Sequence, residues 1–420
     1  MSVDAAAGLP TSESAGVSHH SHKRQEPTVK SSLYNIWRRI LWFNVVACIF
    51  VPLGIISHFL HWGDVPTFVL NVLAIIPLAK MLDYTTDQLS MRVGETMGGL
   101  LNATFGNAVE LIVGVLALKD GQLRVVQASI VGSMLSNILL VLGLCFLCGG
   151  LFPYRKNGYQ KFDADKTNIS NGLLAVVTLG FIVPAAFSMS LKETDAQSTL
   201  SISRGTAVVL LITYVAFLVY QIKTNPDGSV ITPAEHKAGK TAEAILAERE
   251  VEVEDDEEEE VPELLTWIGI LGLVGATCII GVCAEFLVDS LDGLSAKAGL
   301  SHTFIGIIIL PIVGNAAEHV TAVSSAMRNK MDLCIAVAVG SSMQIALMVA
   351  PVLVMVGWMM GKELTLDFQL FETAVLFVSI FVVSTLIADG KTNWMEGWML
   401  LASYVIIAVA FFFVKDHGKE

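Results

Sequence analysis

The chain has 420 residues, of which 54% are hydrophobic and only 15% charged, and its formal net charge is −13. Soluble globular domains contain about 25% charged residues, so this composition excludes an ordinary soluble protein, and we expect no nucleic-acid partner. Residues 205–222 run without a charge, and a helix needs about 20 predominantly apolar residues to cross a bilayer. The sequence therefore predicts a polytopic protein embedded in a lipid bilayer.

Residues 1–34 are predicted to form a disordered cytosolic tail, because they lack an apolar core. His19, His20 and His22 within this tail could bind a metal ion, although a solvated tail is the simpler interpretation. The six cysteines fall in or beside apolar segments, so we expect no disulfide framework. Cys145 and Cys148 form a CxxC motif, for which we expect a packing role and not a redox or zinc role.

Hydropathy predicts an all-α fold with eleven transmembrane helices. The predicted spans cover residues 40–60, 65–82, 96–118, 124–149, 170–190, 204–222, 264–288, 302–325, 333–359, 369–388 and 394–414. They divide into an extra first helix (35–62), a first five-helix repeat (63–222) and a second five-helix repeat (263–415), followed by a tail (416–420). Between the repeats, residues 223–262 form an acidic loop or helix with 13 acids and 4 bases.

Lysine and arginine side chains are enriched in the cytosolic connections of membrane proteins. Five of them, between Lys23 and Arg39, precede or border the first predicted span. This bias predicts a cytosolic N-terminus. With eleven spans, the acidic connection is then also cytosolic, and the C-terminus lies on the opposite side of the membrane.

Two motifs recur at one ungapped offset of 208 residues, which indicates an internal repeat. Residues 106–110 (GNAVE) match residues 314–318 (GNAAE), and Gly132-Ser133 matches Gly340-Ser341. The matches fall in the third and eighth predicted spans and then in the fourth and ninth, so each repeat holds five spans. An odd number of spans gives the two copies opposite orientations, as in secondary transporters that bind substrate near the bilayer midplane.

Glu110 and Glu318 each lie well inside a predicted span. A charged side chain at the bilayer centre costs on the order of 2.5 kcal/mol or more, and no Lys or Arg is predicted in the central part of any span to neutralise it. Two such carboxylates related by pseudosymmetry repel each other unless a divalent cation or bound protons intervene. The alternative is a pair of permanently protonated glutamates, hydrogen-bonded in a structural core.

The neighbours of both glutamates supply oxygen atoms and allow close approach of the backbone. Calcium takes six to eight oxygen ligands, so this surrounding predicts a calcium site, although any single serine could equally be a packing residue. The predicted ligands are Glu110, Glu318, Asn107, Asn315, Gly106, Gly314, Ser133, Ser136, Ser341 and Gln344.

The same two carboxyl groups account for coupling to protons. Burial and a neighbouring carboxylate both disfavour the charged form of a carboxyl group, so each glutamate is expected to hold either calcium or a proton. His319 directly follows Glu318 and is interpreted either as a proton relay or as a core histidine with satisfied hydrogen bonds. Competition of two ions for the same groups is antiport, which needs no cofactor.

Two pairs of acids with i, i+4 spacing end the second and seventh predicted spans, and this spacing puts both members on one helix face. The pairs are Asp83 with Asp87, and Glu285 with Asp289. We interpret them as cation-attracting mouths of two half-channels, or else as ordinary solvated helix ends. The acidic loop is interpreted either as a regulatory element that attracts calcium or as a linker; its densest run is Glu254, Asp255, Asp256, Glu257, Glu258, Glu259 and Glu260.

Residues 102–110 (NATFGNAVE) and 311–319 (PIVGNAAEH), with GSMLSN at 132–137 and GSSMQ at 340–344, resemble the CAX family of calcium/proton exchangers. The resemblance covers about residues 35–415. Within the family, the sequence is similar above all to the fungal vacuolar members. It implies a vacuolar membrane location, calcium loading into an acidic store, and Glu110 and Glu318 as shared ligands of calcium and protons. One departure is Gln88 after Asp87, where the family often has adjacent acids.

Other functions stay open at this point. The nearest alternative is a sodium-coupled exchanger of calcium or another divalent cation such as manganese, although Ile345, the counterpart of Asn137 at the 208 offset, argues against extra sodium sites. A channel or a calcium-sensing receptor is a different class, but an inverted repeat suits alternating access better than a continuous pore. No enzyme activity is expected, and a homo-oligomer is left open.

Overall fold

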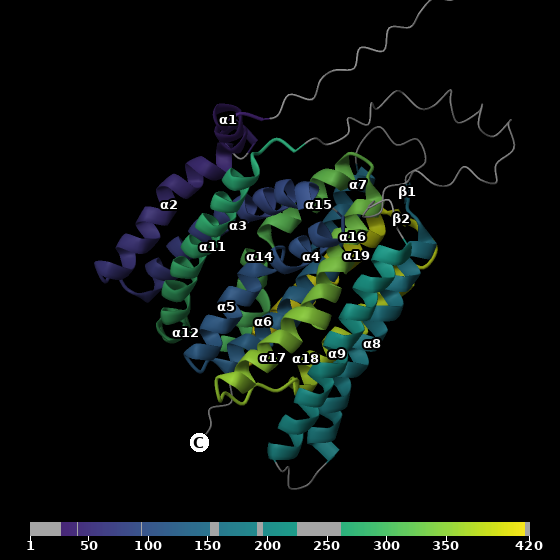
Figure 1. The fold of residues 1–420 in the computed structure, drawn as a ribbon. Helices are drawn as coiled ribbons and strands as arrows, with labels where there is room; N and C mark the ends of the chain where they lie inside the picture. The colour runs from purple at the N-terminus through teal and green to yellow at the C-terminus, as the bar shows by residue number, and fades with distance from the viewer. Residues whose placement is uncertain are drawn as a thin grey trace, which may run out of the picture.

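The computed structural model describes residues 27–39, 41–93, 95–151, 159–190, 196–224 and 262–415, and these residues are mostly helical (Figure 1). The predicted acidic run at 254–260 and the histidines at positions 19, 20 and 22 lie outside the described residues. The predicted all-α class is confirmed for the described part, apart from two strands of three residues each.

Helices follow one another with short connections in both halves of the chain, and three of them are π-helices, labelled η. The first half contains α1 (Val29–Arg39), α2 (Leu41–Phe59), α3 (Asp64–Val93), α4 (Glu95–Phe105), α5 (Ala108–Lys119), α6 (Leu123–Leu135), η1 (Ser136–Val141), α7 (Leu142–Leu151), α8 (Ala164–Ser190) and α9 (Ala196–Thr224). The second half contains α11 (Thr266–Asp289), α12 (Leu291–Ala298), α13 (His302–Phe304), η2 (Ile305–Ile309), α14 (Leu310–Gly314), α15 (Ala316–Met327), α16 (Met331–Gln344), η3 (Ile345–Val349), α17 (Ala350–Met359), α18 (Leu370–Leu386) and α19 (Trp394–Phe412). Helix α1 begins inside the segment predicted as a disordered tail.

Apolar side chains cover the outer surface of many of these helices; Ile406 on α19, for example, is 69% exposed. A lipid environment accepts such a surface, because a helix satisfies its backbone hydrogen bonds within the segment. Among the described residues, seven continuous helical stretches are long and apolar enough to cross a bilayer, and two bent helix pairs raise the number to nine if each pair is one span.

Length and apolarity thus support fewer spans than the eleven predicted, and broken helices are the main reason. The predicted span 96–118 consists of two short helices, α4 and α5, separated by a turn at Gly106 and Asn107. The predicted span 302–325 is interrupted at Asn315, and α18 has only 17 residues. Hydropathy averages over such breaks, whereas the structure resolves them.

Helix α3 extends to Val93, well beyond the predicted end at residue 82. Lys80, Asp83 and Asp87 therefore lie inside a helix and not at its end. Lys80 lies near the middle of this 30-residue helix, close to the end of its apolar stretch. The residues after position 82 are polar but compatible with a helix, so hydropathy detects the end of the apolar stretch and misses the end of the helix.

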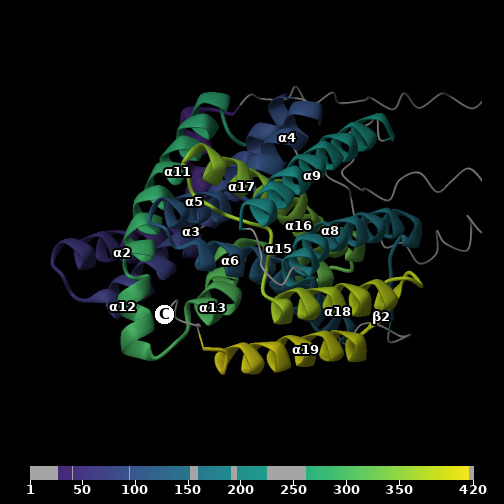
Figure 2. The ribbon, with the colours of Figure 1, turned by 90° about the horizontal axis from the view of Figure 1, so that it is seen from below.

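Two long helical stretches form the centre of the molecule. They are α6–η1–α7 and α16–η3–α17, whose apolar windows are 83% and 72% buried, whereas the other five spanning stretches are between 22% and 50% buried. Helices α3 and α11 pack against each other and α2 packs against both, and α18 and α19 lie side by side along one edge (Figure 2). The central stretches are therefore the scaffold on which a site would be built.

The two strands join connections that are far apart in sequence. Strand β1 (Tyr159–Lys161) pairs antiparallel with β2 (Lys391–Asn393), and Gln160 is opposite Thr392. This small sheet lies at the end of the bundle opposite α12 (Figure 1). It ties the connection before α8 to the connection before α19.

A buried ion pair holds α6 against α18. Both guanidinium amino groups of Arg124 donate to the carboxylate of Glu372, which is completely buried. Nε of Arg124 also donates to the Thr303 hydroxyl (3.2 Å) at the start of the broken helix α13–η2–α14. Three elements are thus connected through one guanidinium group.

Replacing Arg124 with Met is expected to destabilise the protein by about 3 kcal/mol or more, because Glu372 is left buried without its partner. Thermal unfolding of the purified protein in detergent measures this as a lower Tm. A double variant, Arg124→Met with Glu372→Met, removes both charges and should recover most of the lost Tm. A single variant that melts at the wild-type temperature would contradict this assignment.

Candidate cation site

Glu110 lies at the start of a short helix that follows a break. Helix α4 ends at Phe105, Gly106 and Asn107 form a turn, and α5 begins at Ala108 with Asn107 in the capping position. Glu110 is therefore in the first turn of α5. The amide groups of a first helical turn have no partner within the helix, and the helix dipole there favours a nearby negative charge.

The second half of the chain repeats this arrangement. Helix α14 ends at Gly314, Asn315 occupies the capping position, and Glu318 is in the first turn of α15. Pro311, at the start of α14, has no backbone N–H to donate to a hydrogen bond. This weakens the helix before the break. The breaks thus occur at the two positions that the 208-residue offset relates.

Each capping asparagine contacts the other half of the chain. Nδ2 of Asn107 donates to Oε1 of Gln344 over 2.7 Å. Nδ2 of Asn315 donates to Oδ1 of Asn137 over 3.0 Å and to the carbonyl of Ser133 over 3.3 Å. These partners lie at or just before η1 and η3, and π-helical turns are frequent at functional sites. The two breaks are therefore fixed to the central helices by amide side chains.

The two glutamates lie close together across the halves. Oε1 of Glu318 accepts a hydrogen bond from the Ser341 hydroxyl over 2.7 Å. Oε1 of Glu110 lies 2.8 Å from the point that a Cβ on Gly314 would occupy, so the absent side chain of Gly314 lets Glu110 reach the second break. The charges of the two carboxyl groups are close enough to interact.

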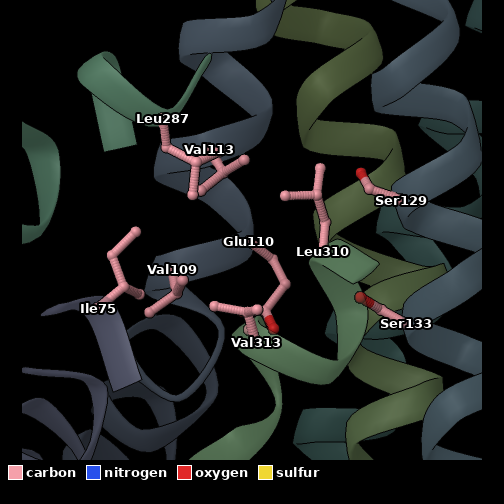
Figure 3. A pocket seen from close by; sticks show the side chains of 10 residues that line it. Ile75, Val109, Glu110, Val113, Ser129, Ser133, Leu287, Leu310 and Val313 are labelled. Carbon is pink, nitrogen blue, oxygen red and sulfur yellow. The ribbon is translucent and has the colours of Figure 1, made fainter. Parts of the chain in front are cut away.

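A small cavity of about 30 Å³ lies beside Glu110 (Figure 3). Apolar side chains from α3, α5, α11 and α14 form most of its wall, and Ser129 and Ser133 of α6 complete it. This volume holds one or two water molecules or a single ion. Ser133, the counterpart of Ser341 in the repeat, therefore lines the same cavity as the glutamate of its own half.

Three buried polar atoms near the breaks have no hydrogen bond of ordinary geometry within the described part of the chain. They are Oε2 of Glu318, Oδ1 of Asn315 and Nδ2 of Asn137, and the side chains of Asn137 and Glu318 are close enough to interact. A buried polar group without a partner costs about 1–3 kcal/mol. Two of these atoms are oxygens with available lone pairs, which are the ligands that a hard cation such as Ca²⁺ prefers.

The described residues contain no group of three His, Cys, Asp or Glu side chains arranged to hold a metal ion. A cation beside the two glutamates can complete its coordination with amide, hydroxyl or carbonyl oxygens and with water. Asn315, Ser133 and Ser341 are suitably placed for this. The chemistry of the site favours a hard cation over a soft transition metal.

Several other predicted site residues bind neighbouring side chains or the backbone. Nδ1 of His319 lies 2.6 Å from the Asn315 carbonyl, and Nε2 lies 3.5 Å from the Ser136 hydroxyl. Both ring nitrogens thus have polar neighbours, which favours the interpretation of His319 as a core histidine. Ser136 and Gln344 contact His319 and Asn107 respectively, and neither has a described hydrogen bond with a glutamate.

The two predicted mouths each contain an acid that is paired with a lysine. Oδ2 of Asp83 accepts from Nζ of Lys80 over 2.7 Å, and the exposed Asp87 lies one turn further along α3. Oε1 of Glu285 accepts from Nζ of Lys119 over 2.9 Å. Asp289 is exposed at the end of α11 and interacts electrostatically with Glu285.

Two features of the site are missing from the sequence prediction. The first is Asn137, whose amide group binds Asn315; its position directly after Ser136 in the repeated motif is a signal that could have identified it. The second is Lys80, which reaches Thr321 of α15 over 2.9 Å. A contact between residues 241 positions apart has no signal in a single sequence.

Comparison with known proteins gives consistent results over most of the chain. The sodium/calcium exchanger protein family matches residues 64–223 and 268–413. A vacuolar calcium ion transporter from Schizosaccharomyces pombe is 45% identical over 374 residues, which cover 89% of this chain and 85% of that protein. Vacuolar cation/proton exchanger 2 from Arabidopsis thaliana is 38% identical over 417 residues, which cover 99% of this chain and 91% of that protein.

Solved structures give a matching fold. The structure of native YfkE superposes with a TM-score of 0.72 at 34% identity and covers 89% of this chain and 99% of its own. The crystal structure of the H⁺/Ca²⁺ exchanger CAX superposes with a TM-score of 0.62, covering 90% of this chain and 92% of its own. At 14% identity, the second likeness concerns the fold alone.

Proposed function

Because the chain belongs to the sodium/calcium exchanger protein family, we propose that it exchanges cytosolic calcium for protons from an acidic compartment. In this proposal Glu110 and Glu318 bind calcium and protons in competition, and the protein alternates between two states that open to opposite sides. The names of the relatives support both ions and a vacuolar membrane: one is a vacuolar calcium ion transporter and another a vacuolar cation/proton exchanger.

The observation that carries the proposal is the position of the two glutamates. Each lies in the first turn of a helix after a break, and Glu110 reaches past Gly314 to the break of the other half. A site built at the interface of two repeats, from interrupted helices, is typical of secondary transporters. The ionic partner of such a pair must carry positive charge, because two carboxylates that close together repel each other when both are ionised.

Calcium fits the oxygen atoms that surround the glutamates. The carboxylates, the free Oδ1 of Asn315 and the serine hydroxyls are hard ligands, and calcium accepts six to eight such oxygens in flexible geometry. When calcium leaves, protons are the alternative that removes the charge. Loss of one ion from the site thus favours binding of the other, which is the basis of exchange.

We further propose the arrangement of eleven helices as 1+5+5, with inverted repeats at 63–222 and 263–415. The contacts between distant connections support it, because they join segments that this arrangement assigns to one side. On the proposed cytosolic side, β1 pairs with β2, and the Tyr84 hydroxyl donates to Glu263 over 3.0 Å. On the proposed lumenal side, Nζ of Lys297 donates to Asp64 over 2.7 Å.

The first half packs directly on the interrupted helix of the second half. A Cβ on Gly132 would lie 2.6 Å from Cγ of Pro311, so α6 approaches α14 closely. This contact supports a site built at the interface of two repeats, as in secondary transporters.

Glu110→Gln and Glu318→Gln are each expected to abolish calcium uptake driven by a pH gradient, because an amide group can neither release a proton nor neutralise calcium. Radioactive calcium uptake by proteoliposomes measures this. Glu363→Gln, a change of an exposed loop carboxylate, serves as the matched control and should transport normally. Wild-type uptake by both site variants would reject the assignment of the site.

Gly314→Ala is expected to leave the fold intact but to raise the KM for calcium about tenfold, equivalent to about 1.4 kcal/mol. The added methyl group would lie 2.8 Å from Oε1 of Glu110, and the flexible glutamate must turn away from the second break. Gly205→Ala on α9, where a Cβ meets nothing within 4 Å, is the control. Unchanged KM in Gly314→Ala would contradict the role of this close approach.

A sodium-coupled exchanger is the alternative that the uptake assay also tests. Ile345, the counterpart of Asn137 in the repeat, is buried at the start of η3. Its side chain has no oxygen atom that could bind a second cation. Calcium uptake is therefore expected to depend on a pH gradient and to proceed without sodium. Uptake that requires a sodium gradient and ignores pH would favour the alternative.

A further inference from the structure

We propose that Lys80 is a resident cation at the cytosolic mouth of the site, which competes with calcium for Asp83 and thereby sets the affinity for cytosolic calcium. The inference rests on the calcium/proton exchange and the membrane orientation proposed above. It gives a function to a basic side chain inside a spanning helix, where ionisable groups are costly and usually functional.

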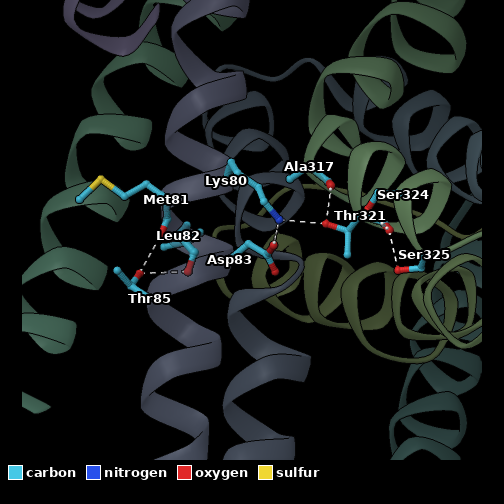
Figure 4. A network of polar contacts seen from close by, with 9 residues as sticks. All are labelled: Lys80, Met81, Leu82, Asp83, Thr85, Ala317, Thr321, Ser324 and Ser325. Carbon is cyan, nitrogen blue, oxygen red and sulfur yellow. Dashed lines mark hydrogen bonds and ion pairs between the residues drawn. The ribbon is translucent and has the colours of Figure 1, made fainter. Parts of the chain in front are cut away.

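The ammonium group of Lys80 lies between two helices and is held from both (Figure 4). It donates to Oδ2 of Asp83 on α3 over 2.7 Å and to the hydroxyl of Thr321 on α15 over 2.9 Å. The side chain of Lys80 is only 22% exposed, whereas that of Asp83 is 47% exposed. The lysine is thus the more enclosed member of the pair.

Thr321 is oriented to accept the hydrogen bond from Lys80. Its own hydroxyl proton is donated to the carbonyl of Ala317 over 3.0 Å, which leaves the oxygen lone pairs for the ammonium group. Lys80 is therefore attached to α15, the helix that carries Glu318, as well as to an acid on its own helix.

This contact lies next to the proposed calcium site. Thr321 follows Glu318 by three residues on α15, and side chains at that spacing are neighbours on one helix face. The carboxylate of Asp83 is also close enough to Glu318 for their charges to interact. The ammonium group of Lys80 therefore lies beside the face of α15 that carries Glu318.

The positive charge of Lys80 acts in two ways on a calcium ion that approaches from this side. It neutralises Asp83, which would otherwise attract calcium, and it repels a divalent ion directly. The repulsion is strong because the group is partly buried, where charges interact more strongly than in water. Calcium binding from this side thus requires displacement of the ammonium group from Asp83, which weakens the apparent affinity.

The lysine–acid pair described at the opposite mouth is more exposed and lies farther from the proposed calcium site. Lys119 pairs with Glu285, but these side chains are 56% and 45% exposed, and Lys119 is the last residue of α5, far along the helix from Glu110. Exposed ion pairs are weak and are screened by salt. Lys119→Met therefore provides a matched control in which a lysine paired with a mouth acid is removed far from the site.

The test measures pH-driven calcium uptake by proteoliposomes that contain the full-length protein, with calcium varied on the cytosolic face. Lys80→Met is expected to lower the KM for calcium about tenfold, because it frees Asp83 and removes the repulsion. Lys80→Arg keeps the charge and Lys119→Met leaves the site alone, so both should retain the wild-type KM within about twofold. An unchanged or raised KM in Lys80→Met would overturn the proposal.

A Lys80→Cys variant separates charge from packing. Reaction with 2-aminoethyl methanethiosulfonate restores an ammonium group at this position. Reaction with methyl methanethiosulfonate adds an uncharged methylthio group instead. The first reagent should return the KM to the wild-type value, and the second should leave it low. Wild-type protein treated in the same way controls for the six native cysteines, and an equal KM after both reagents would refute the charge effect.

If a variant transports too slowly for its KM to be measured, equilibrium binding of radioactive calcium to the purified protein replaces the uptake assay. The Kd values of the variants are then compared in place of their KM values. The wild type separates this inference from the function on which it rests. Absence of pH-driven uptake by the wild type would refute the proposed exchange. Normal wild-type uptake, with affinity unaffected by Lys80→Met, would refute the role of Lys80 alone.

Discussion

Two carboxyl groups that lie close together inside an apolar protein cannot both stay ionised without a positive partner. In this chain they are Glu110 and Glu318, whose charges interact across the two halves. Burial penalises the charged form, and the neighbouring carboxylate adds to that penalty. In the proposed function the site therefore contains either a cation or protons at every stage, and this constraint would make the two ions mutually exclusive.

The fold interrupts two helices just before the two glutamates. The breaks at Asn107 and Asn315 place Glu110 and Glu318 in the first turns of α5 and α15. The asparagine side chains bind Gln344 and Asn137 and so fix the breaks to the central stretches. Irregular backbone is tolerated at membrane depth only where protein or a polar cavity surrounds it. The buried central stretches α6–η1–α7 and α16–η3–α17 provide that surrounding.

The sequence repeat predicted that the two glutamates, the two asparagines, and Ser133 and Ser341 occupy equivalent positions in the two halves. Motifs that recur at a constant offset indicate such pseudosymmetry without any structure. Hydropathy located the apolar segments but could not predict that α3 continues to Val93 or that α4 and α5 are separate helices. The contact of Lys80 with Thr321 joins different helices, and tertiary packing of this kind is absent from the periodicity of one sequence. The acidic run at 254–260 lies outside the described residues and stays a prediction.

Competition between calcium and protons for the same carboxyl groups is the central claim, and proton release measures it most directly. Calcium is added to the purified protein in weakly buffered detergent solution, and the released protons are counted with a pH indicator. The account predicts that calcium binding releases protons, that its affinity rises with pH, and that Glu110→Gln with Glu318→Gln removes the release. Calcium binding of equal affinity at every pH, without proton release, would contradict it.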